Sequence, residues 1–290
     1  MDKKTFDRRR QDVGNIVGLE HVNVRIPDQQ IATAFYVVGM GFTRDPYLMV
    51  GLDNMWINLG QQQFHLPTNK PQVLRGVTGV VVPDLEALVE RLTSVKGVLS
   101  GTMFDFAVDA QHVTVTCPWG NKLRAHAPAP EYAQMTLGMP YVEFPVDPGT
   151  ADGIVRFYRE IIGAHATAKD GVARVTVGSQ QTLVFRESPE PKPAYDGHHI
   201  AVYVSDFSGP HAKLQERGLV SEESNEYQYR FVTITDPATN RPLFDIEHEV
   251  RCVTHPMYLR PLVCRNPAQR QPTYQRGQDA FVNGARYDSR

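Results

Sequence analysis

Several features that mark common protein classes are scarce in this 290-residue sequence or missing from it. Its three cysteines, Cys117, Cys252 and Cys264, form no CxxC spacing, which argues against a disulfide framework and favours reduced thiols in a cytoplasmic protein. No stretch approaches about 18 consecutive apolar residues, so we expect no transmembrane helix. The charged opening, MDKKTFDRRR, has no apolar region behind it, so we expect no secretory signal.

An excess of charge of either sign is also missing. Thirty Lys and Arg stand against 32 Asp and Glu, which gives no reason to expect a nucleic acid or a membrane as partner. There is no GxGxxG or Walker pattern for a phosphate, and neither a GxSxG motif nor a Cys/His pair for a covalent nucleophile. These absences argue against a phosphate-binding loop and a covalent nucleophile, and they do not by themselves identify a partner.

What the sequence does contain is an internal repeat. GLEHVNVRIPD (18–28) matches GMPYVEFPVD (138–147), and VTGVVVPDL (77–85) matches HIAVYVSDF (199–207). Equivalent points recur after about 120 residues, as expected of a tandem duplication. Each of the four segments reads as a strand followed by Pro or Asp turn chemistry and a helix.

The repeat predicts an α+β fold built from four βαβββ modules, each with one strand, one helix and three further strands. Two halves, 18–127 and 138–249, contain two modules each, and residues 250–290 form a C-terminal arm of low periodicity. We expect the arm to pack on its own domain or on a second subunit of a homodimer, although its basic character also fits an acidic partner. The modules span about 18–68, 76–127, 138–187 and 197–249.

The order of these motifs resembles the vicinal-oxygen-chelate superfamily, which includes glyoxalase I, bleomycin-resistance proteins and extradiol dioxygenases. The segments that carry the resemblance, within residues 18–249, are HVNVRIPD (21–28), QFHLP (63–67), HIAVYVSD (199–206) and LFDIEHE (243–249). The resemblance implies that modules pair into two open, cup-shaped mixed sheets flanked by helices. It also implies that metal ligands come from the first and fourth strands of two paired modules.

Transferred to this sequence, the ligand positions are His21 and His65 in module one and His199 and Asp245 in module four. Modules two and three have no ligand-type residue at the matching positions. We therefore expect module one to pair with module four, and module two with module three, which gives one complete metal site and one inactive one. The inactive positions are Val77, Arg124, Tyr141 and Val184.

Three imidazoles and one carboxylate suit one divalent transition metal, Fe, Mn, Zn, Ni or Co, rather than Ca or Mg. The resemblance then implies a substrate that chelates this metal through vicinal oxygens. Glu247, on the same strand face as Asp245, is the candidate catalytic base, with Glu143 and Tyr203 as alternatives. Tyr203 is also a candidate substrate-binding residue, as is Arg124, whose other interpretation is an ion pair at the edge of the core.

Two classes of function stay open at this point. The first is a metal-dependent enzyme, either a dioxygenase or a lyase or isomerase. Glyoxalase I usually has Glu where this sequence has His65 and Asp245, which argues against lactoylglutathione lyase activity. The alternative is a metal-free protein that binds or sequesters a small molecule, as bleomycin-resistance proteins do. A degenerate protein that keeps only the fold is a third interpretation.

Overall fold

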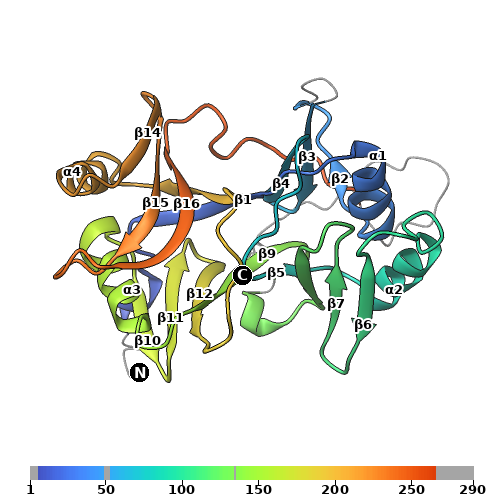
Figure 1. Cartoon of the computed structure of the whole chain (residues 1–290), viewed down its shortest axis with the longest axis horizontal. Helices are drawn as coiled ribbons and strands as arrows, with labels where there is room; N and C mark the ends of the chain where they lie inside the picture. The colour runs from blue at the N-terminus through green and yellow to red at the C-terminus, as the bar shows by residue number, and fades with distance from the viewer. Residues whose placement is uncertain (1–5, 49–52, 134, 266–290) are drawn as a thin grey trace, which may run out of the picture.

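The computed structural model describes residues 6–48, 53–133 and 135–265, and it contains two eight-stranded mixed sheets, neither closed into a barrel (Figure 1). The strand orders are β14-β15-β16-β13-β1-β4-β3-β2 and β10-β11-β12-β9-β5-β8-β7-β6. Each sheet therefore joins two βαβββ units through a central antiparallel strand pair, and the predicted fold class is confirmed.

The first sheet combines modules one and four. Its central strands are β1 (Ile16–Asn23) and β13 (His199–Val204), which run antiparallel. The remaining strands are β2 (Thr43–Arg44), β3 (Asn54–Leu59), β4 (Gln62–Pro67), β14 (Val220–Asn225), β15 (Gln228–Thr235) and β16 (Pro242–Cys252).

The second sheet combines modules two and three, around β5 (Val77–Val81) and β9 (Gly138–Val146). Both predicted pairings are thus confirmed, and each sequence half contributes one module to each sheet. The remaining strands are β6 (Asp105–Val108), β7 (His112–Thr116), β8 (Lys122–His126), β10 (Ala166–Lys169), β11 (Val172–Val177) and β12 (Gln181–Glu187).

The helices begin where the sequence supplies a capping residue or a turn. Asp28 accepts hydrogen bonds from the backbone N–H groups of Gln30 and Ile31 and so caps α1, and Asp84 caps α2 through Ala87. The first and third modules each continue their helix as a π-helical segment. The helical elements are η1 (Arg8–Gln11), α1 (Gln29–Ala32), η2 (Thr33–Gly39), α2 (Leu85–Ser94), η3 (Pro130–Tyr132), α3 (Ala151–Phe157), η4 (Tyr158–Ile162) and α4 (Ser208–Glu216).

Strand alternation separates a polar face of the first sheet from an apolar one. Val22 on β1 and Val24 just after it are buried in the hydrophobic core, whereas His21 and Asn23 point to the opposite side. The same polar side carries His199 on β13, opposite Asn23 in the register. This polar face is where side chains from modules one and four meet.

The arm was predicted to begin at residue 250, but residues 250–252 form the end of β16, and residues 253–265 pack on module one of the same chain. Arg260 forms an ion pair with the buried Asp45 at 2.7 Å, and the carbonyl of Val263 accepts a hydrogen bond from Nδ2 of Asn58 at 3.0 Å. The backbone N–H of Arg265 donates to Oγ1 of Thr43. The rest of the predicted arm, 266–290, lies outside the described residues.

Within the described ranges, no helix is long and apolar enough to cross a membrane.

Candidate metal centre

Three histidines from three different strands meet on the polar face of the first sheet. His21 lies on β1, His65 on β4 and His199 on β13, and one ring nitrogen from each lies within 4.8 Å of the other two. The ring of His21 is 5.5 Å from that of His65 and 5.6 Å from that of His199. We call these three residues the imidazole cluster; two of them come from module one and one from module four.

The nitrogens that face one another have no hydrogen-bond partner. They are Nε2 of His21, Nε2 of His199 and both ring nitrogens of His65. His21 is fully buried and His199 is 6% exposed, so water does not compensate for the missing bonds. Buried polar atoms without partners are costly and uncommon, and a converging group of them is what a bound cation would satisfy.

Carboxylates on the outer side of the cluster fix the orientation of two rings. Nδ1–H of His21 donates to Glu20 at 2.9 Å, and Nδ1 of His199 lies 3.2 Å from Oε2 of Glu247. Each bond places the proton on Nδ1 and leaves Nε2 as a free lone pair pointing inward. A carboxylate behind a histidine in this way is typical of metal-binding histidines.

Glu20 reaches His21 because of a bulge in β1. The pairing with β13 shifts between Leu19 and His21, so the strict alternation of faces is broken at Glu20. The carboxylate of Glu20 also accepts a hydrogen bond from the hydroxyl of Tyr203 at 2.6 Å and pairs with Arg251. The bulge thus brings a charged group behind the buried imidazole.

His65 is held by stacking instead of by a carboxylate. Its ring lies 3.9 Å from that of Trp56, with only 10° between the planes. Burial lowers the pKa of His65 to about 2, and the neighbouring His21 and His199 act in the same direction. His65 is therefore a neutral imidazole with one available nitrogen lone pair.

Strand register identifies the fourth position of the site. On β4, Gln63 lies opposite His21, and His65 is two residues further along. On β16, Glu247 lies opposite His199, so the residue two further along is Glu249. The same offset of two residues holds in the second sheet. Lys122 lies opposite Val77, and the residue two further along is Arg124. Thr182 lies opposite Tyr141, and the residue two further along is Val184.

Asp245, predicted as the fourth ligand, does not lie with the imidazole cluster. It precedes Glu247 by two residues, its carboxylate accepts a hydrogen bond from Oγ1 of Thr233 at 2.9 Å, and its carbonyl accepts one from Arg75. The strand register places Glu249, four residues after Asp245, at the position of β16 that is equivalent to His65 on β4.

Glu249 has the surroundings that the fourth position requires. It is 3% exposed, and its Oε2 lies 3.5 Å from Nε2 of His199. Burial opposes its ionisation, but the close approach of His199 and the positive charge of Arg251 keep its pKa below the usual range. Arg230 and Arg251 each contact one of its oxygens at 2.5 Å.

The other predicted site residues have different positions. Glu247 is bound to His199 and to Arg230 at 2.9 Å, so it lies behind a histidine and not on the open side of the cluster. The hydroxyl of Tyr203 is used by Glu20. Arg124 belongs to the second sheet, where it contacts the hydroxyl of Tyr141 at 3.4 Å.

Glu143, the alternative base, is also in the second sheet, paired with Arg186. In the part of the chain that the structure describes, no group of His, Cys, Asp or Glu that could hold a metal forms on that sheet.

Asn23 is a polar residue of the site that sequence reasoning missed. It is 3% exposed, its Oδ1 has no partner, and it lies opposite both His199 and His65 in the strand register. Its place two residues after His21 on the same strand face was the available signal. It offers a hydrogen-bond acceptor next to the imidazole cluster.

Known structures share this architecture. No family model and no curated protein sequence matches the chain. Glyoxalase I from Zea mays superposes with a TM-score of 0.56 at 12% sequence identity, over 82% of this chain and 92% of that one. A Bacillus subtilis protein provisionally described as a dioxygenase superposes with a TM-score of 0.54 at 14% identity, over 82% and 86%.

These likenesses define the class of fold. The chain has the vicinal-oxygen-chelate fold that its sequence motifs resemble, with two paired-module sheets in one polypeptide. At such low identity the likeness shows the fold alone, so the function has to be argued from the site itself.

Proposed function

We propose that this protein is a metal-dependent enzyme in which His21, His65, His199 and Glu249 hold one divalent transition-metal ion. The observation that carries the proposal is the set of buried, unpartnered imidazole nitrogens that converge within 4.8 Å of one another. Three imidazoles and a carboxylate match the ligand preferences of Fe, Mn, Zn, Ni and Co. A bound ion of this kind supplies Lewis-acid chemistry to a small molecule that chelates it through two neighbouring oxygens.

The chain's own residues prepare the site for such a ligand. Glu20 and Glu247 hold the Nδ1 protons of two histidines and so keep both rings in one orientation. Asn23 offers its unpartnered Oδ1 to a hydroxyl or N–H group of the substrate. Burial of His21 and Asn23 excludes water from the inner side of the site, which strengthens each polar contact there.

The carboxylates around the cluster favour an oxygenase over an isomerase or lyase. Glu20 and Glu249 pair with Arg251, and Glu247 pairs with Arg230. A general base must be free to take a proton from the substrate, and each of these carboxylates is already occupied by a cation. Oxygen activation depends on the ferrous ion that the histidines and one carboxylate would hold, and so relies less on a free carboxylate base of the chain.

Metal analysis tests the proposal directly. Purified protein should carry, or take up after dialysis, close to one equivalent of Fe(II) or Co(II), and Co(II) should give a visible d–d spectrum. His21→Ala should abolish this uptake. His112→Ala is the matched control, because His112 is a partly exposed histidine of the second sheet. Uptake that survives in His21→Ala, or is absent from the wild type, contradicts the proposal and favours a metal-free binding protein.

Oxygen consumption tests the reaction class. Fe(II)-loaded protein should consume oxygen with a panel of catechols and other vicinal diols, and the apoprotein should not. If the metal-loaded protein instead isomerises 2-oxoaldehyde adducts without oxygen uptake, the protein is a lyase or isomerase and not an oxygenase.

A further inference from the structure

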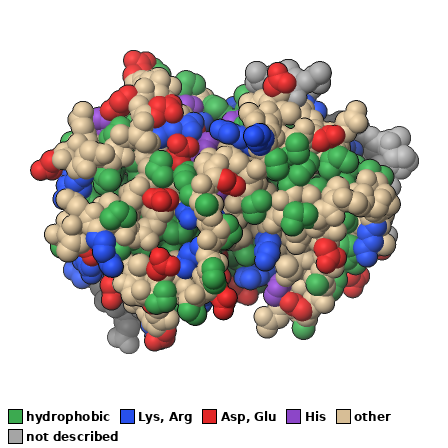
Figure 2. Space-filling view, viewed as in Figure 1, with side chains coloured by type: hydrophobic (Ala, Val, Ile, Leu, Met, Phe, Trp, Pro, Cys, Tyr) green, Lys and Arg blue, Asp and Glu red, His purple; other side chains and the backbone are tan. Residues whose placement is uncertain are grey.

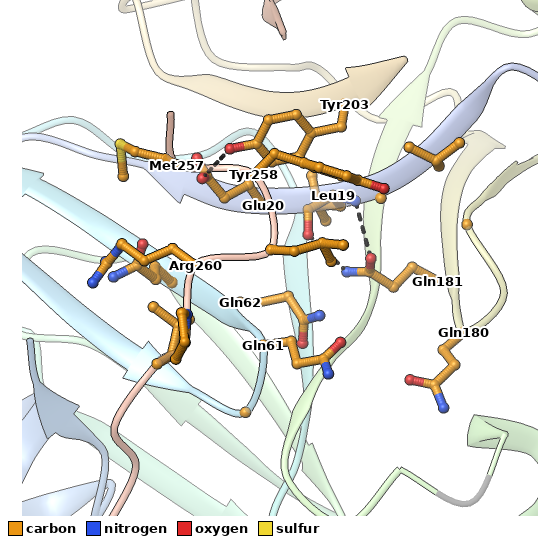
Figure 3. Close-up of a pocket in the computed structure, with 18 of the residues that line it drawn as sticks. Leu19, Glu20, Gln61, Gln62, Gln180, Gln181, Tyr203, Met257, Tyr258 and Arg260 are labelled. Carbon is orange, nitrogen blue, oxygen red and sulfur yellow. Dashed lines mark hydrogen bonds between the residues drawn. The ribbon is translucent and has the colours of Figure 1, made fainter. Parts of the chain in front are cut away.

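A cavity of about 410 Å³ lies under the C-terminal arm, and the proposed metal centre does not use it. Figure 3 shows this cavity, which we call the arm cavity. Its walls come from four segments that are far apart in the sequence: the start of β1, the β3–β4 turn, the β11–β12 turn and the arm. They are residues 17–20, 60–63, 178–181 and 257–263, with Tyr203 in addition.

The arm cavity carries two charged residues, and both are neutralised. Glu20 pairs with Arg251 and accepts from Tyr203, and Arg260 pairs with the buried Asp45 at 2.7 Å. A ligand with a net charge would therefore find no unpaired counter-charge in these walls, and its desolvation would not be compensated. The walls favour an uncharged ligand.

The two sides of the arm cavity differ in chemistry. The rings of Tyr203 and Tyr258, with Met257, lie on one side, and carboxamide side chains lie on the other (Figure 3). The tyrosine rings are 4.8 Å apart and 65° from parallel, so they form an edge-to-face apolar wall. The carboxamides that face it are Gln61, Gln62, Gln180 and Gln181.

Some of these carboxamides brace the walls and others are available to a ligand. Gln181 is bound to the backbone of Leu19 and Met139, and Gln62 accepts from the N–H of Met139. Gln61 and Gln180 are exposed on the turns, so they can turn toward an occupant. A rigid floor with adjustable donors and acceptors at its rim is typical of a small-molecule pocket.

The arm cavity lies beside the imidazole cluster, because its lining residue Tyr203 is on the same face of β13 as His199. It is lined by Glu20, which contacts Nδ1 of His21, whereas the unpartnered Nε2 of that ring faces the other two histidines. An occupant of the cavity is thus separated from the ion position by a carboxylate and an imidazole ring. The three cluster histidines are not among the residues that line the cavity.

We propose that the arm cavity is a second ligand site, distinct from the metal centre, for an uncharged ring compound with hydrogen-bonding groups along one edge. The apolar part packs against the two tyrosine rings, and the polar edge meets the glutamines. The C-terminal arm forms one wall, so the site exists only while the arm is docked on module one.

A glycine on β1 allows the arm cavity to be filled selectively. Gly18 lines the cavity, and a Cβ added there would have no atom within 4 Å. Gly18→Phe therefore places a ring in the open space without a clash at its base. Gly97→Phe is the matched control, because a Cβ at this exposed glycine after α2 also meets nothing within 4 Å.

The probe is Nile red, an uncharged planar dye whose emission rises in apolar surroundings. We expect saturable binding of one equivalent to the wild type and to Gly97→Phe, and at least a tenfold weaker affinity in Gly18→Phe. The dye should bind equally to metal-free protein and to protein titrated with Co(II). Unchanged affinity in Gly18→Phe, absence of saturable binding to the wild type, or displacement of the dye by Co(II) would each overturn the proposal.

A second variant tests the arm cavity independently, in case Gly18→Phe does not fold. Leu262 is a half-buried wall residue of the arm, and Leu262→Glu adds an unpaired charge there without altering either sheet. It should also weaken dye binding at least tenfold while near-UV circular dichroism stays unchanged. Wild-type affinity in Leu262→Glu would refute the site even if Gly18→Phe did not fold. Because the dye test needs no metal, failure of the proposed metal function would leave its outcome intact.

Discussion

The two sheets have the same architecture but differ in what occupies the four equivalent positions. In the first sheet they carry His21, His65, His199 and Glu249, and in the second sheet Val77, Arg124, Tyr141 and Val184. The strand pairing, including the offset of two residues between opposite strands, is common to both. The fold therefore does not need the polar residues, and their presence on one sheet calls for a functional reason.

In the second sheet, side chains that contact one another stand where the first sheet has its imidazole cluster. The ring of Tyr141 lies over Gly79, so close that a Cβ at Gly79 would be 2.4 Å from Cε1 of the tyrosine. Its hydroxyl contacts Nε2 of His126 at 2.9 Å and the guanidinium of Arg124. Side chains contact one another here through the Tyr141 hydroxyl, whereas the imidazole cluster keeps its inner nitrogens unpartnered.

The largest expected effect separates Glu249 from Asp245. Glu249→Gln removes the buried carboxylate 3.5 Å from His199 and should weaken Co(II) binding by about 100-fold or more. Asp245→Asn, on the same strand face, should change the affinity less than about twofold, because its carboxylate contacts Thr233 and not the cluster. Competitive titration with a chelator measures both. The reverse ranking would restore Asp245 as the fourth ligand.

The difference between the two sheets explains which features of the site could be predicted from the sequence. Pairing of module one with module four was predictable because ligand-type residues are present in only those two modules. The positions of His21, His65 and His199 came from the family resemblance, and strand alternation agrees with them. Asp245 was chosen because F-D-I resembles a family motif. β16 is 11 residues long and presents Asp245, Glu247 and Glu249 on one face, so only the register with β13 distinguishes them.

Glu20 could not be found from the sequence. Alternation places it on the opposite face from His21, and a bulge leaves no clear signal in a single strand of eight residues. The course of the arm was equally hidden, because contacts such as that between Arg260 and Asp45 join residues 215 positions apart. Long-range ion pairs of this kind depend on the tertiary fold and not on local pattern.

The second prediction concerns a substitution that destabilises the second sheet and leaves the first sheet unchanged. Gly79→Ala forces the Tyr141 ring aside and should lower the free energy of unfolding by about 2 kcal/mol, the usual cost of overpacking. Urea denaturation followed by circular dichroism measures the change, with Gly97→Ala as the control at an open position. Co(II) affinity should stay at the wild-type value. A Gly79→Ala protein as stable as the wild type would mean that Tyr141 does not fill this site.

The third prediction concerns the carboxylate behind His21. Glu20→Gln keeps the shape of the side chain but weakens its hold on the Nδ1 proton of His21, and it leaves Arg251 with one carboxylate partner fewer. We expect Co(II) affinity to fall about tenfold, the usual effect of losing an outer-shell partner. The Co(II) spectrum should remain, since no ligand is lost. Complete loss of the spectrum would make Glu20 itself a ligand.

The smallest effect is expected for Arg124, and it tests whether the two sheets act independently. If this guanidinium bound the substrate, Arg124→Ala would raise KM for any diol that supports oxygen uptake. Arg124 lies on β8 of the second sheet, opposite Gly79 and Thr114 and in contact with the Tyr141 hydroxyl, with no contact to the imidazole cluster. We therefore expect KM and Co(II) affinity to stay within about twofold of wild type, as for a residue outside the site. A tenfold rise in KM would show that the second sheet takes part in substrate binding.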